Sequence, residues 1–397
     1  MSDDALPVEE RLTGVVVCQQ ANFFYVMVGA DEYACSLRGR LKKEGETPYV
    51  GDRVEIVLEP PAPGERLPPP RSGSLMLPDR PDAVPDVRSG AISTLLPRRN
   101  LLERPTIANV DQVLLVVAAA QPEFSAYMLD KFLVLAAHGD LPPVIVINKR
   151  DLVPPEQLAA MIDGYRSIGY AVVSTAAGNA DVSELLPHLA GKLSVLAGPS
   201  GVGKSSIVNA MLPGLELRAL EVSTKLQRGR HTTRHAALYA LVAVPDALIA
   251  DTPGFSFLEM EAILPKDLGW YFPEMAPHIA DCKLPSCLHM QEHSCAVKER
   301  AVIRPERYES YVRLLDEVQA IERDAAERSS KEETAVKRRM GAGGLEGRLV
   351  KVDVAARESD RKTRNQRLNA DWQEAAEDED DFELDDLEAL DGIDEEA

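Results

Sequence analysis

The stretch that most constrains this chain is 198–206, which reads Gly-Pro-Ser-Gly-Val-Gly-Lys-Ser-Ser and fits the pattern G-x-x-x-x-G-K-[ST]. The apolar run 193–197 before it predicts a buried strand, and 206–212 after it predicts a helix. Glycines let backbone N–H groups approach a phosphate closely, and a helix N-terminus favours its negative charge. The sequence therefore predicts a phosphate-binding loop in preference to a plain glycine-rich turn.

We expect the whole loop to hold a nucleotide through Gly198, Pro199, Ser200, Gly201, Val202, Gly203, Lys204, Ser205 and Ser206. In this motif the Lys204 ammonium is expected to reach the β- and γ-phosphates. The Ser205 hydroxyl is expected to ligate Mg²⁺.

Length, charge and cysteine content set the outer limits. A chain of 397 residues is long enough for two or three domains, and no apolar run is long enough to span a bilayer. The formal net charge is -20, but residues 371–397 contain 15 of the 64 acidic residues and no basic ones. We expect this acidic tail to be disordered. The N-terminus lacks a signal-peptide pattern, so we expect a cytoplasmic protein.

The N-terminal region is predicted to contain short strands at 15–18, 23–28, 33–37 and 52–57, with a returning strand near 90–96. Strands at this spacing favour a small OB-like barrel, a fold that often binds RNA. Four aromatic residues of this region are candidates for stacking on RNA bases: Phe23, Phe24, Tyr25 and Tyr33. For any single one of them, a place in the barrel core is the preferred interpretation. Residues 59–89 hold nine of the 28 prolines and are predicted to form a linker or long barrel loop.

From residue 109 onward, apolar strands alternate with amphipathic helices, which predicts a mostly parallel sheet covered by helices on both faces. The expected strands are 113–118, 144–147, 171–173, 193–197, 238–244 and 247–250, and the expected helices before the phosphate loop are 127–137 and 158–168. Ligands bind such sheets at the carboxyl ends of their strands.

The strand 144–147 ends in the sequence N-K-x-D, formed by Asn148, Lys149, Arg150 and Asp151. We expect the Asp151 carboxylate to accept hydrogen bonds from guanine N1–H and the 2-amino group. Adenine lacks this donor pair and would leave the carboxylate unpaired, which discriminates strongly. Asn148 is expected to contact the base edge and Lys149 to lie against the ring.

Three further segments complete a nucleotide site. The next strand ends in small residues, Ser174, Thr175 and Ala176, which are typical of a loop that supports the base. Asp251-Thr-Pro-Gly254 fits D-x-x-G, in which Asp251 is expected to hold Mg²⁺ through water and the Gly254 N–H to sense the γ-phosphate. Between the phosphate loop and D-x-x-G, either Thr232 or Thr233 is expected to bind Mg²⁺, and the sequence does not choose between the two.

The order of the motifs is unusual, because N-K-x-D and the small-residue loop precede the phosphate loop. In ordinary GTPases both of these motifs follow the phosphate loop and D-x-x-G. The same sheet can be built after the chain is cut and rejoined elsewhere, so the order predicts a circular permutation.

Three cysteines and a histidine lie close together in the pattern Cys282-x₄-Cys287-x-His289-x₅-Cys295. Three thiolates and one imidazole make a closed tetrahedral set for one structural Zn²⁺ ion. Buried free cysteines are the weaker alternative, and spacing alone leaves His293 open as a substitute for His289.

With this motif order and this cluster, residues 10–325 resemble the RsgA (YjeQ) family of circularly permuted GTPases, which act in maturation of the bacterial small ribosomal subunit. The resemblance implies an N-terminal OB domain, a central GTPase domain and a C-terminal zinc domain. It also implies GTP hydrolysis stimulated by the small subunit, and it favours His289 as the zinc ligand.

The expected domains are a barrel at 1–100, the GTPase domain at 101–258, a helical zinc domain at 259–328 and a basic then acidic tail at 329–397. Phe255 follows the D-x-x-G motif, where many GTPases have a glutamine that orients water. We therefore expect slow intrinsic hydrolysis, with His231 or a ribosomal group orienting the water; a solvated loop histidine is an equal alternative.

The leading interpretation is a monomeric GTPase that binds the small ribosomal subunit and its rRNA late in maturation. Basic residues at 337–339 and 357–367 are candidates for rRNA phosphate contacts, or else belong to a solvated tail. The alternatives are a guanine-nucleotide-dependent RNA-binding scaffold with incidental hydrolysis, and an ATP-dependent enzyme, which the N-K-x-D motif disfavours.

Overall fold

The computed structural model describes residues 11–20, 22–29, 31–59, 88–103, 106–212, 237–241, 243–251 and 260–340. The chain divides into two compact units, one ending at Glu259 and the other beginning at Met260. Most of the predicted proline-rich loop and the acidic tail lie outside the described residues. Among the described helices, none combines the length and the apolar character that a bilayer span requires.

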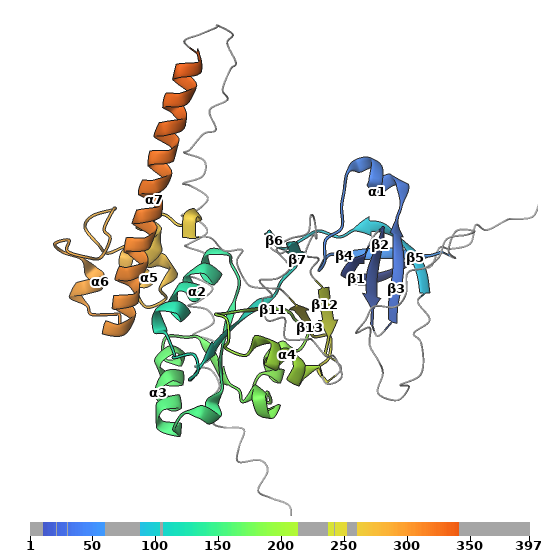
Figure 1. The fold of residues 1–397 in the computed structure, drawn as a ribbon, viewed down its shortest axis with the longest axis horizontal. Helices are drawn as coiled ribbons and strands as arrows, with labels where there is room; N and C mark the ends of the chain where they lie inside the picture. Colours follow the sequence, from blue (N-terminus) through green and yellow to red (C-terminus); the bar gives the residue numbers. More distant parts are fainter. Residues whose placement is uncertain are drawn as a thin grey trace, which may run out of the picture. The chain divides into compact units, whose positions relative to one another are not determined.

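The first unit begins with five strands that close into a barrel in the order β1-β2-β3-β5-β4, as the sequence predicted (Figure 1). Its strands are β1 (Arg11–Gln20), β2 (Phe23–Val28), β3 (Asp31–Leu37), β4 (Arg53–Leu58) and β5 (Arg88–Leu95). Only the pair β3–β5 is parallel. A short helix, α1 (Gly39–Glu44), follows β3 and was not predicted.

Three of the aromatic residues are buried. Phe24 and Tyr33, at 6% and 3% exposure, belong to the hydrophobic core of the barrel. Tyr25, at 0% exposure, lies outside that cluster, and its hydroxyl donates to Gln20 Oε1 at 3.3 Å. Because all three side chains are buried, the base-stacking reading does not apply to them.

A hydrogen-bonded seam joins the barrel to the chain that leads into the sheet. The hairpin β6 (Leu101–Glu103) and β7 (Thr106–Ala108) ends beside the barrel loop at Val50. The Ala108 N–H donates to the Val50 carbonyl oxygen at 2.8 Å, and the Asn109 side-chain amide donates to the Gly51 carbonyl oxygen at 3.0 Å. The barrel loop is thus tied to the residues just before the first strand of the sheet.

An ion pair strengthens the same seam. The fully buried Asp52 carboxylate accepts from Arg98 Nε at 2.7 Å and from Arg98 Nη2 at 2.8 Å, a two-point geometry that suits a guanidinium. The same carboxylate also accepts from the Tyr49 N–H at 2.7 Å, and the guanidinium lies 4.6 Å from the centre of the Tyr49 ring. The cost of burying Asp52 is therefore offset by hydrogen bonds on both oxygens.

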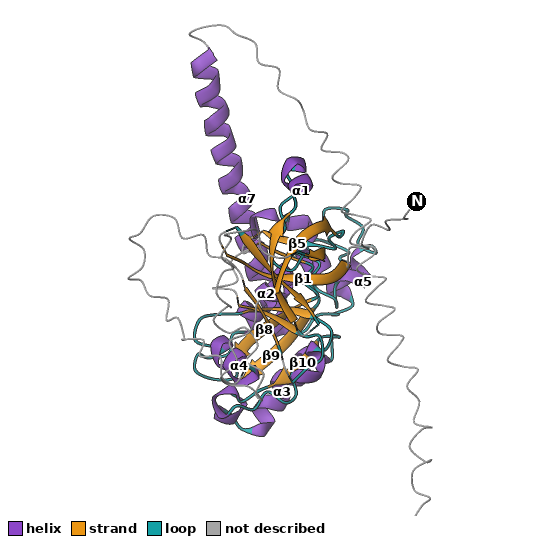
Figure 2. Cartoon of the chain, turned by 90° about the vertical axis from the view of Figure 1, so that its right-hand side faces the viewer, coloured by secondary structure: helices purple, strands orange, loops and turns teal. Residues whose placement is uncertain are grey.

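The remainder of the first unit is built on a six-stranded sheet in the order β10-β9-β8-β11-β13-β12. Its strands are β8 (Gln112–Ala118), β9 (Pro143–Asn148), β10 (Ala171–Ser174), β11 (Leu193–Ala197), β12 (Ala237–Ala240) and β13 (Leu248–Asp251). All neighbours are parallel except β12, which pairs antiparallel with β13. Figure 2 shows β8, β9 and β10 side by side.

The helices cover both faces of this sheet, as predicted. Helix α4 (Lys204–Met211) packs on the face that carries Leu114 and Val116. Figure 1 shows α2 (Ala126–His138) and α3 (Pro155–Arg166) on the other side, where α2 contacts β8 and β9 and α3 contacts β10. Because both faces are covered, the strands β8 and β11 are buried along their whole length, which suits their mostly apolar sequences. Their two polar residues, Gln112 and Ser194, are hydrogen-bonded to each other at 2.9 Å.

The second unit consists of short helices, one irregular loop and a long helix. Its elements are 3₁₀ turns at Met260–Ala262 and Pro265–Tyr271 and the helices α5 (Ala276–Ile279), α6 (Ala296–Glu299) and α7 (Pro305–Met340). The first turns of α7 pack through the buried Tyr311, Leu314 and Leu315. Arg307 on α7 forms a buried two-point ion pair with Glu274, at 2.5 and 3.2 Å, and its guanidinium lies 5.1 Å from the centre of the Phe272 ring.

Candidate functional site

Three loops of the first unit start at the carboxyl ends of three parallel strands of the sheet: β9 and β10, which are neighbours, and β11, which is separated from β9 by β8. The phosphate-loop sequence follows β11, the N-K-x-D sequence ends β9, and the small-residue loop follows β10. Parallel strands place these ends at one edge of the sheet, the edge at which such sheets bind ligands. The motif order along the chain is permuted, yet the sheet places all three loops together.

The backbone of the phosphate loop requires glycine at two points. Gly198 has a φ of +139°, and a Cβ there would lie 2.0 Å from the Val116 carbonyl oxygen on β8. Gly203 has a φ of +98°, and a Cβ there would lie 2.3 Å from Asn148 Nδ2. Both positions are left-handed and crowded, so a side chain would displace the loop from the neighbouring strands.

Lys204 is the first residue of α4, and its side chain folds back over the loop. Its Nζ donates to the carbonyl oxygens of Gly198 and Pro199, both at 2.7 Å. Burial lowers the pKa of Lys204 because removal from water disfavours the ammonium. Ser205 and Ser206 follow on the exposed first turn of the helix. An anion bound here would restore a charged partner to the Lys204 side chain.

Asn148 joins the three loops. Its Nδ2 donates to the Val202 carbonyl oxygen at 2.9 Å, which ties β9 to the phosphate loop. Its Oδ1 accepts from Thr175 Oγ1 at 2.9 Å and from the Ala177 N–H at 3.1 Å, which ties it to the small-residue loop. The side chain is 1% exposed, so it holds the loops together in addition to any contact with a base.

Lys149 makes a second connection between β9 and the phosphate loop. Its Nζ donates to the Gly201 carbonyl oxygen at 2.8 Å and also to the Gln121 carbonyl oxygen. Its backbone has a φ of +62°, in the left-handed region, where the chain turns from β9 into the 3₁₀ turn Arg150–Leu152. Asp151 lies in that turn and is exposed.

Arg150 contacts two acidic residues that the sequence did not single out. Its guanidinium pairs with Glu184 at 2.7 Å and with Asp181, both in the segment after the small-residue loop. The sequence around these two carboxylates gives no indication of a role, because each looks like an ordinary solvated loop residue. Only the fold, which places β9 beside β10, brings them to Arg150.

The remaining predicted nucleotide residues are described in part or not at all. Asp251 is the last residue of β13, and its backbone pairs with Ala237 on β12. The predicted catalytic or switch residues His231, Thr232, Thr233 and Gly254 lie outside the described residues, as does Phe255.

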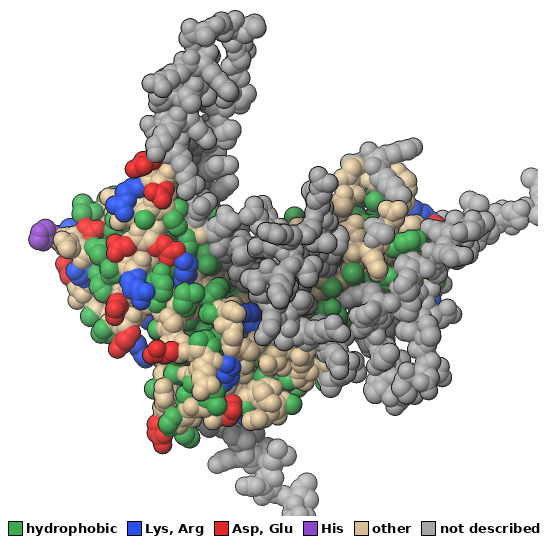
Figure 3. Space-filling model, viewed as in Figure 1, with side chains coloured by type: hydrophobic (Ala, Val, Ile, Leu, Met, Phe, Trp, Pro, Cys, Tyr) green, Lys and Arg blue, Asp and Glu red, His purple; other side chains and the backbone are tan. Residues whose placement is uncertain are grey.

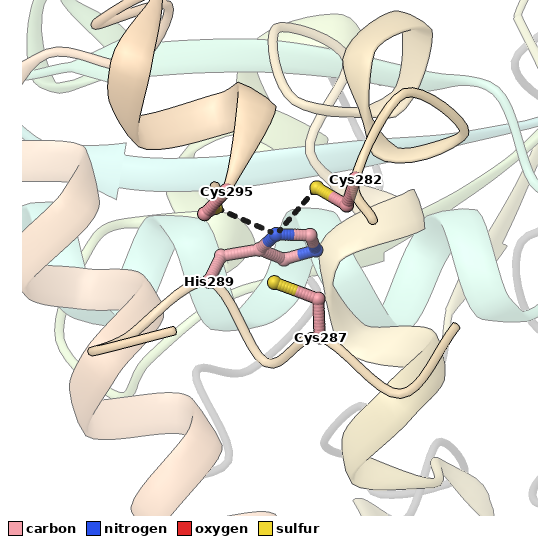
Figure 4. Close-up of side chains that lie close together, drawn as sticks. All are labelled: Cys282, Cys287, His289 and Cys295. Atoms are coloured by element: carbon pink, nitrogen blue, oxygen red, sulfur yellow. Dashed lines mark hydrogen bonds between the residues drawn. The ribbon is translucent and has the colours of Figure 1, made fainter. Parts of the chain in front are cut away.

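The second unit brings the four predicted zinc ligands together (Figure 4). The thiol sulfurs and the imidazole nitrogen lie within 4.8 Å of one another. His289 Nδ1 lies 3.4 Å from Cys295 Sγ and 3.7 Å from Cys282 Sγ. A tetrahedral zinc ion with bonds of about 2.0–2.3 Å separates its ligands by roughly 3.5–3.8 Å. The spacing therefore fits a zinc ion held by all four side chains.

The cluster is mostly buried and its loop is held in place by neighbouring residues. Burial raises the pKa of Cys287 to about 12, so without a cation this thiol keeps its proton. Two tyrosines of α7 hold the loop from behind: Tyr308 donates to the His289 carbonyl oxygen at 2.8 Å and Tyr311 donates to the Leu288 carbonyl oxygen at 2.7 Å. His293, the alternative ligand, is exposed and lies outside the cluster, so the geometry selects His289.

Comparison with known proteins agrees with this architecture. The family model described as "RsgA GTPase" matches residues 95–261, and "RsgA N-terminal domain" matches residues 13–64. A third model, described as "50S ribosome-binding GTPase", matches residues 194–334.

Similar curated proteins include two named "Small ribosomal subunit biogenesis GTPase RsgA". The one from Geobacillus thermodenitrificans is 40% identical over 77% of this chain and 97% of its own length. The one from Carboxydothermus hydrogenoformans is 42% identical over 79% of this chain and 100% of its own length.

Two solved structures are also similar, each with a TM-score of 0.60. One is YloQ, described as a circularly permuted GTPase, which is 32% identical over 78% of this chain and 96% of its own. The other is YjeQ from Thermotoga maritima, 36% identical over 78% of this chain and 99% of its own. The permuted loops, the barrel and these whole-length relatives show that this chain belongs to the RsgA family of circularly permuted GTPases.

Proposed function

We propose that this GTPase binds the small ribosomal subunit and its rRNA and hydrolyses GTP during late maturation of that subunit. The observation that carries the proposal is the junction at Asn148, which fixes the N-K-x-D turn, the small-residue loop and the phosphate loop to one another. A pocket that reads guanine at one end and holds phosphates at the other needs this connection. The two curated relatives match this chain over 97% and 100% of their own length, and both are named for small-subunit biogenesis.

In this proposal the residues of the predicted pocket have separate tasks. The Asp151 carboxylate, exposed in its turn, accepts from the base, and the N–H groups of the phosphate loop hold the β- and γ-phosphates together with Lys204. Ser205, Asp251 and one threonine of 232–233 would hold Mg²⁺, which neutralises phosphate charge when it is bound. His231 remains our proposal for the group that orients the attacking water.

The flanking domains supply the ribosomal contacts in this proposal. The closed barrel is of a type that often binds RNA, and the zinc cluster holds the irregular loop of the second unit in place. On the face of the second unit seen in Figure 3, basic and acidic side chains are interspersed. The described side chains on that face therefore form no continuous basic surface, and the barrel is our first choice for rRNA. We expect the protein to act as a monomer in the cytoplasm.

The proposal is tested by measuring phosphate release from GTP with purified small subunits, with purified large subunits and with neither, at several salt concentrations. Strong stimulation by small subunits alone is expected, and it should weaken as salt rises because rRNA contacts are electrostatic. Stimulation by large subunits alone would overturn the assignment to the small subunit. An rRNA-dependent, GTP-dependent association without stimulation would favour the scaffold alternative.

A second arm tests the base-reading role of Asp151. Asp151→Asn replaces an acceptor by a donor, so guanine loses a partner while the 2-oxo group of xanthine gains one. We expect GTP binding to weaken and xanthosine triphosphate binding to strengthen, measured by competition with a fluorescent nucleotide. Asp163→Asn, an exposed aspartate on α3, is the matched control. An unchanged ranking of the two bases in Asp151→Asn would remove Asp151 from guanine recognition.

A further inference from the structure

Arg150 is the residue that the N-K-x-D pattern leaves variable, yet it makes more polar contacts than its neighbour Asp151 in the described structure. Its Nη1 donates to Glu184 Oε1 at 2.7 Å and lies 3.3 Å from both the hydroxyl and the carbonyl oxygen of Ser174. Its Nη2 donates to Asp181 Oδ2. Its backbone N–H donates to the Thr175 carbonyl oxygen at 3.1 Å. Both the backbone and the side chain of Arg150, which lies in the same turn as Asp151, are thus hydrogen-bonded to the end of β10 and to the loop that follows it.

The loop that receives these bonds is itself closed by the same carboxylates. Glu184 Oε2 accepts from the Ser174 N–H at 2.9 Å and from the Ser174 hydroxyl at 3.1 Å. The backbones of Ala176 and Asp181 exchange hydrogen bonds of 2.9 and 3.2 Å. Segment 174–184 is therefore a closed loop, and Arg150 occupies the point at which its two ends meet.

The charges around this point make the guanidinium necessary. Asp181 and Glu184 both contact Arg150, so two carboxylates share one cation. Removal of the cation would leave Asp181 and Glu184 to repel each other. The Arg150 side chain is 27% exposed and its partners are more so, and ion pairs of this kind add little to global stability. Their effect is expected in the placement of the loops.

We infer that Arg150 is a positioning residue for guanine selection: with Asp181 and Glu184 it locks the Asp151 turn to the small-residue loop and so fixes the Asp151 carboxylate against the base. Asn148 makes the corresponding connection on the buried side of the same loop, through Thr175 and Ala177. The small-residue loop is therefore held from both sides. This inference rests on the proposed guanine site.

The test compares the dissociation constants of GDP, IDP and ADP, because inosine keeps guanine N1–H and O6 but lacks the 2-amino group that Asp151 reads. In Arg150→Ala, GDP binding is expected to weaken about 10-fold and IDP binding only about 2-fold, because GDP has two contacts with the Asp151 carboxylate to lose and IDP has one. The ratio of the IDP to the GDP dissociation constant therefore falls toward one. Arg150→Lys keeps the charge without the two-pronged geometry and is expected to restore the ratio in part.

Arg166→Ala is the matched control. Arg166 also donates to a β10 carbonyl oxygen, that of Val172 at 3.1 Å, but from the helix α3. We expect Arg166→Ala to keep the wild-type ratio of IDP to GDP binding, with a melting temperature close to that of Arg150→Ala. A wild-type ratio in Arg150→Ala would overturn the inference. A wild-type protein that binds ADP as tightly as GDP would overturn the guanine site itself, which is a separate outcome.

Discussion

Asn148 and Val202 lie 54 positions apart in the sequence, yet the side-chain Nδ2 of Asn148 donates to the carbonyl oxygen of Val202 at 2.9 Å. This bond links the strand that ends in the N-K-x-D turn to the phosphate-loop sequence. The other side of the same amide accepts from Thr175 and from the Ala177 N–H. One buried side chain therefore connects all three loops of the proposed nucleotide pocket.

Replacement of this side chain should cost stability as well as affinity. Asn148→Ala leaves three buried polar groups without their partner, and we expect the free energy of unfolding of the first unit to fall by about 2–4 kcal/mol. Thr175→Val removes one of these bonds with little change of shape and should cost about 1 kcal/mol. Urea denaturation measures both values. Asn179→Ala, an exposed asparagine of the same loop, is the control, and an equal loss there would contradict this assignment.

Gly198 should not tolerate any side chain. In Gly198→Ala the new methyl group would meet the Val116 carbonyl oxygen at 2.0 Å, in a backbone conformation that already disfavours alanine. We expect a loss of more than about 2 kcal/mol in unfolding free energy, together with weaker nucleotide binding. Gly178→Ala is the matched control, because a Cβ at Gly178 meets nothing within 4 Å. A Gly198→Ala protein as stable as Gly178→Ala would show that the loop can move away from β8.

Zinc binding should depend on His289 and not on His293. The wild-type protein is expected to hold one zinc ion per chain, measured by elemental analysis after dialysis, and the zinc should be retained in His293→Ala. In His289→Ala the zinc content should fall well below one, and the second unit should melt at a lower temperature, because closed tetrahedral sites contribute directly to folding. Full zinc content in His289→Ala would mean that the ligand set is different.

The stability of the first unit should respond to pH through His188. Burial lowers the pKa of His188, with a further contribution from the Lys192 ammonium. At pH values near the ordinary histidine pKa of about 6.5, the unfolded chain therefore binds more protons than the folded one. The unfolding free energy should fall as the pH drops through this region and level off above it.

His188→Gln should reduce that slope, measured by urea denaturation between pH 5 and pH 8. His293→Gln, in the other unit, is the control. A slope unchanged by His188→Gln would assign the pH response to other groups.

The sheet was predictable because its strands are continuous apolar runs, and burial on both faces leaves no other place for such runs. The helices α2 and α3 were expected within a few residues of their observed ends for the same reason. The hairpin β6–β7 was not predicted, since each strand has only three residues and depends on the seam with Val50. Strand β12 ends at Ala240, earlier than expected, because Leu241 begins a turn closed by its hydrogen bond to Ala247.

Candidate site residues could be predicted where they belong to a short sequence motif. They could not be predicted where their role depends on contacts between separate loops. The motifs containing Lys204 and Asp151 are short enough to be read directly. Spacing could not separate His289 from His293; the fold does so by burying His289 at a φ of +58°. Asp181 and Glu184 carry no motif at all, and only the pairing of β9 with β10 brings them to Arg150.

The barrel seam connects the barrel, through strand β8, to the N-K-x-D turn. From Asn109, whose amide grips the barrel loop at Gly51, the chain enters the seven-residue strand β8 almost at once. At the far end of that strand, the Ala119 N–H donates to the Asn148 carbonyl oxygen at 2.8 Å. One buried strand, with a hydrogen bond at each end, therefore connects the barrel loop to the residue at which the N-K-x-D turn begins. A partner that displaced the barrel loop would act on that turn over a short path.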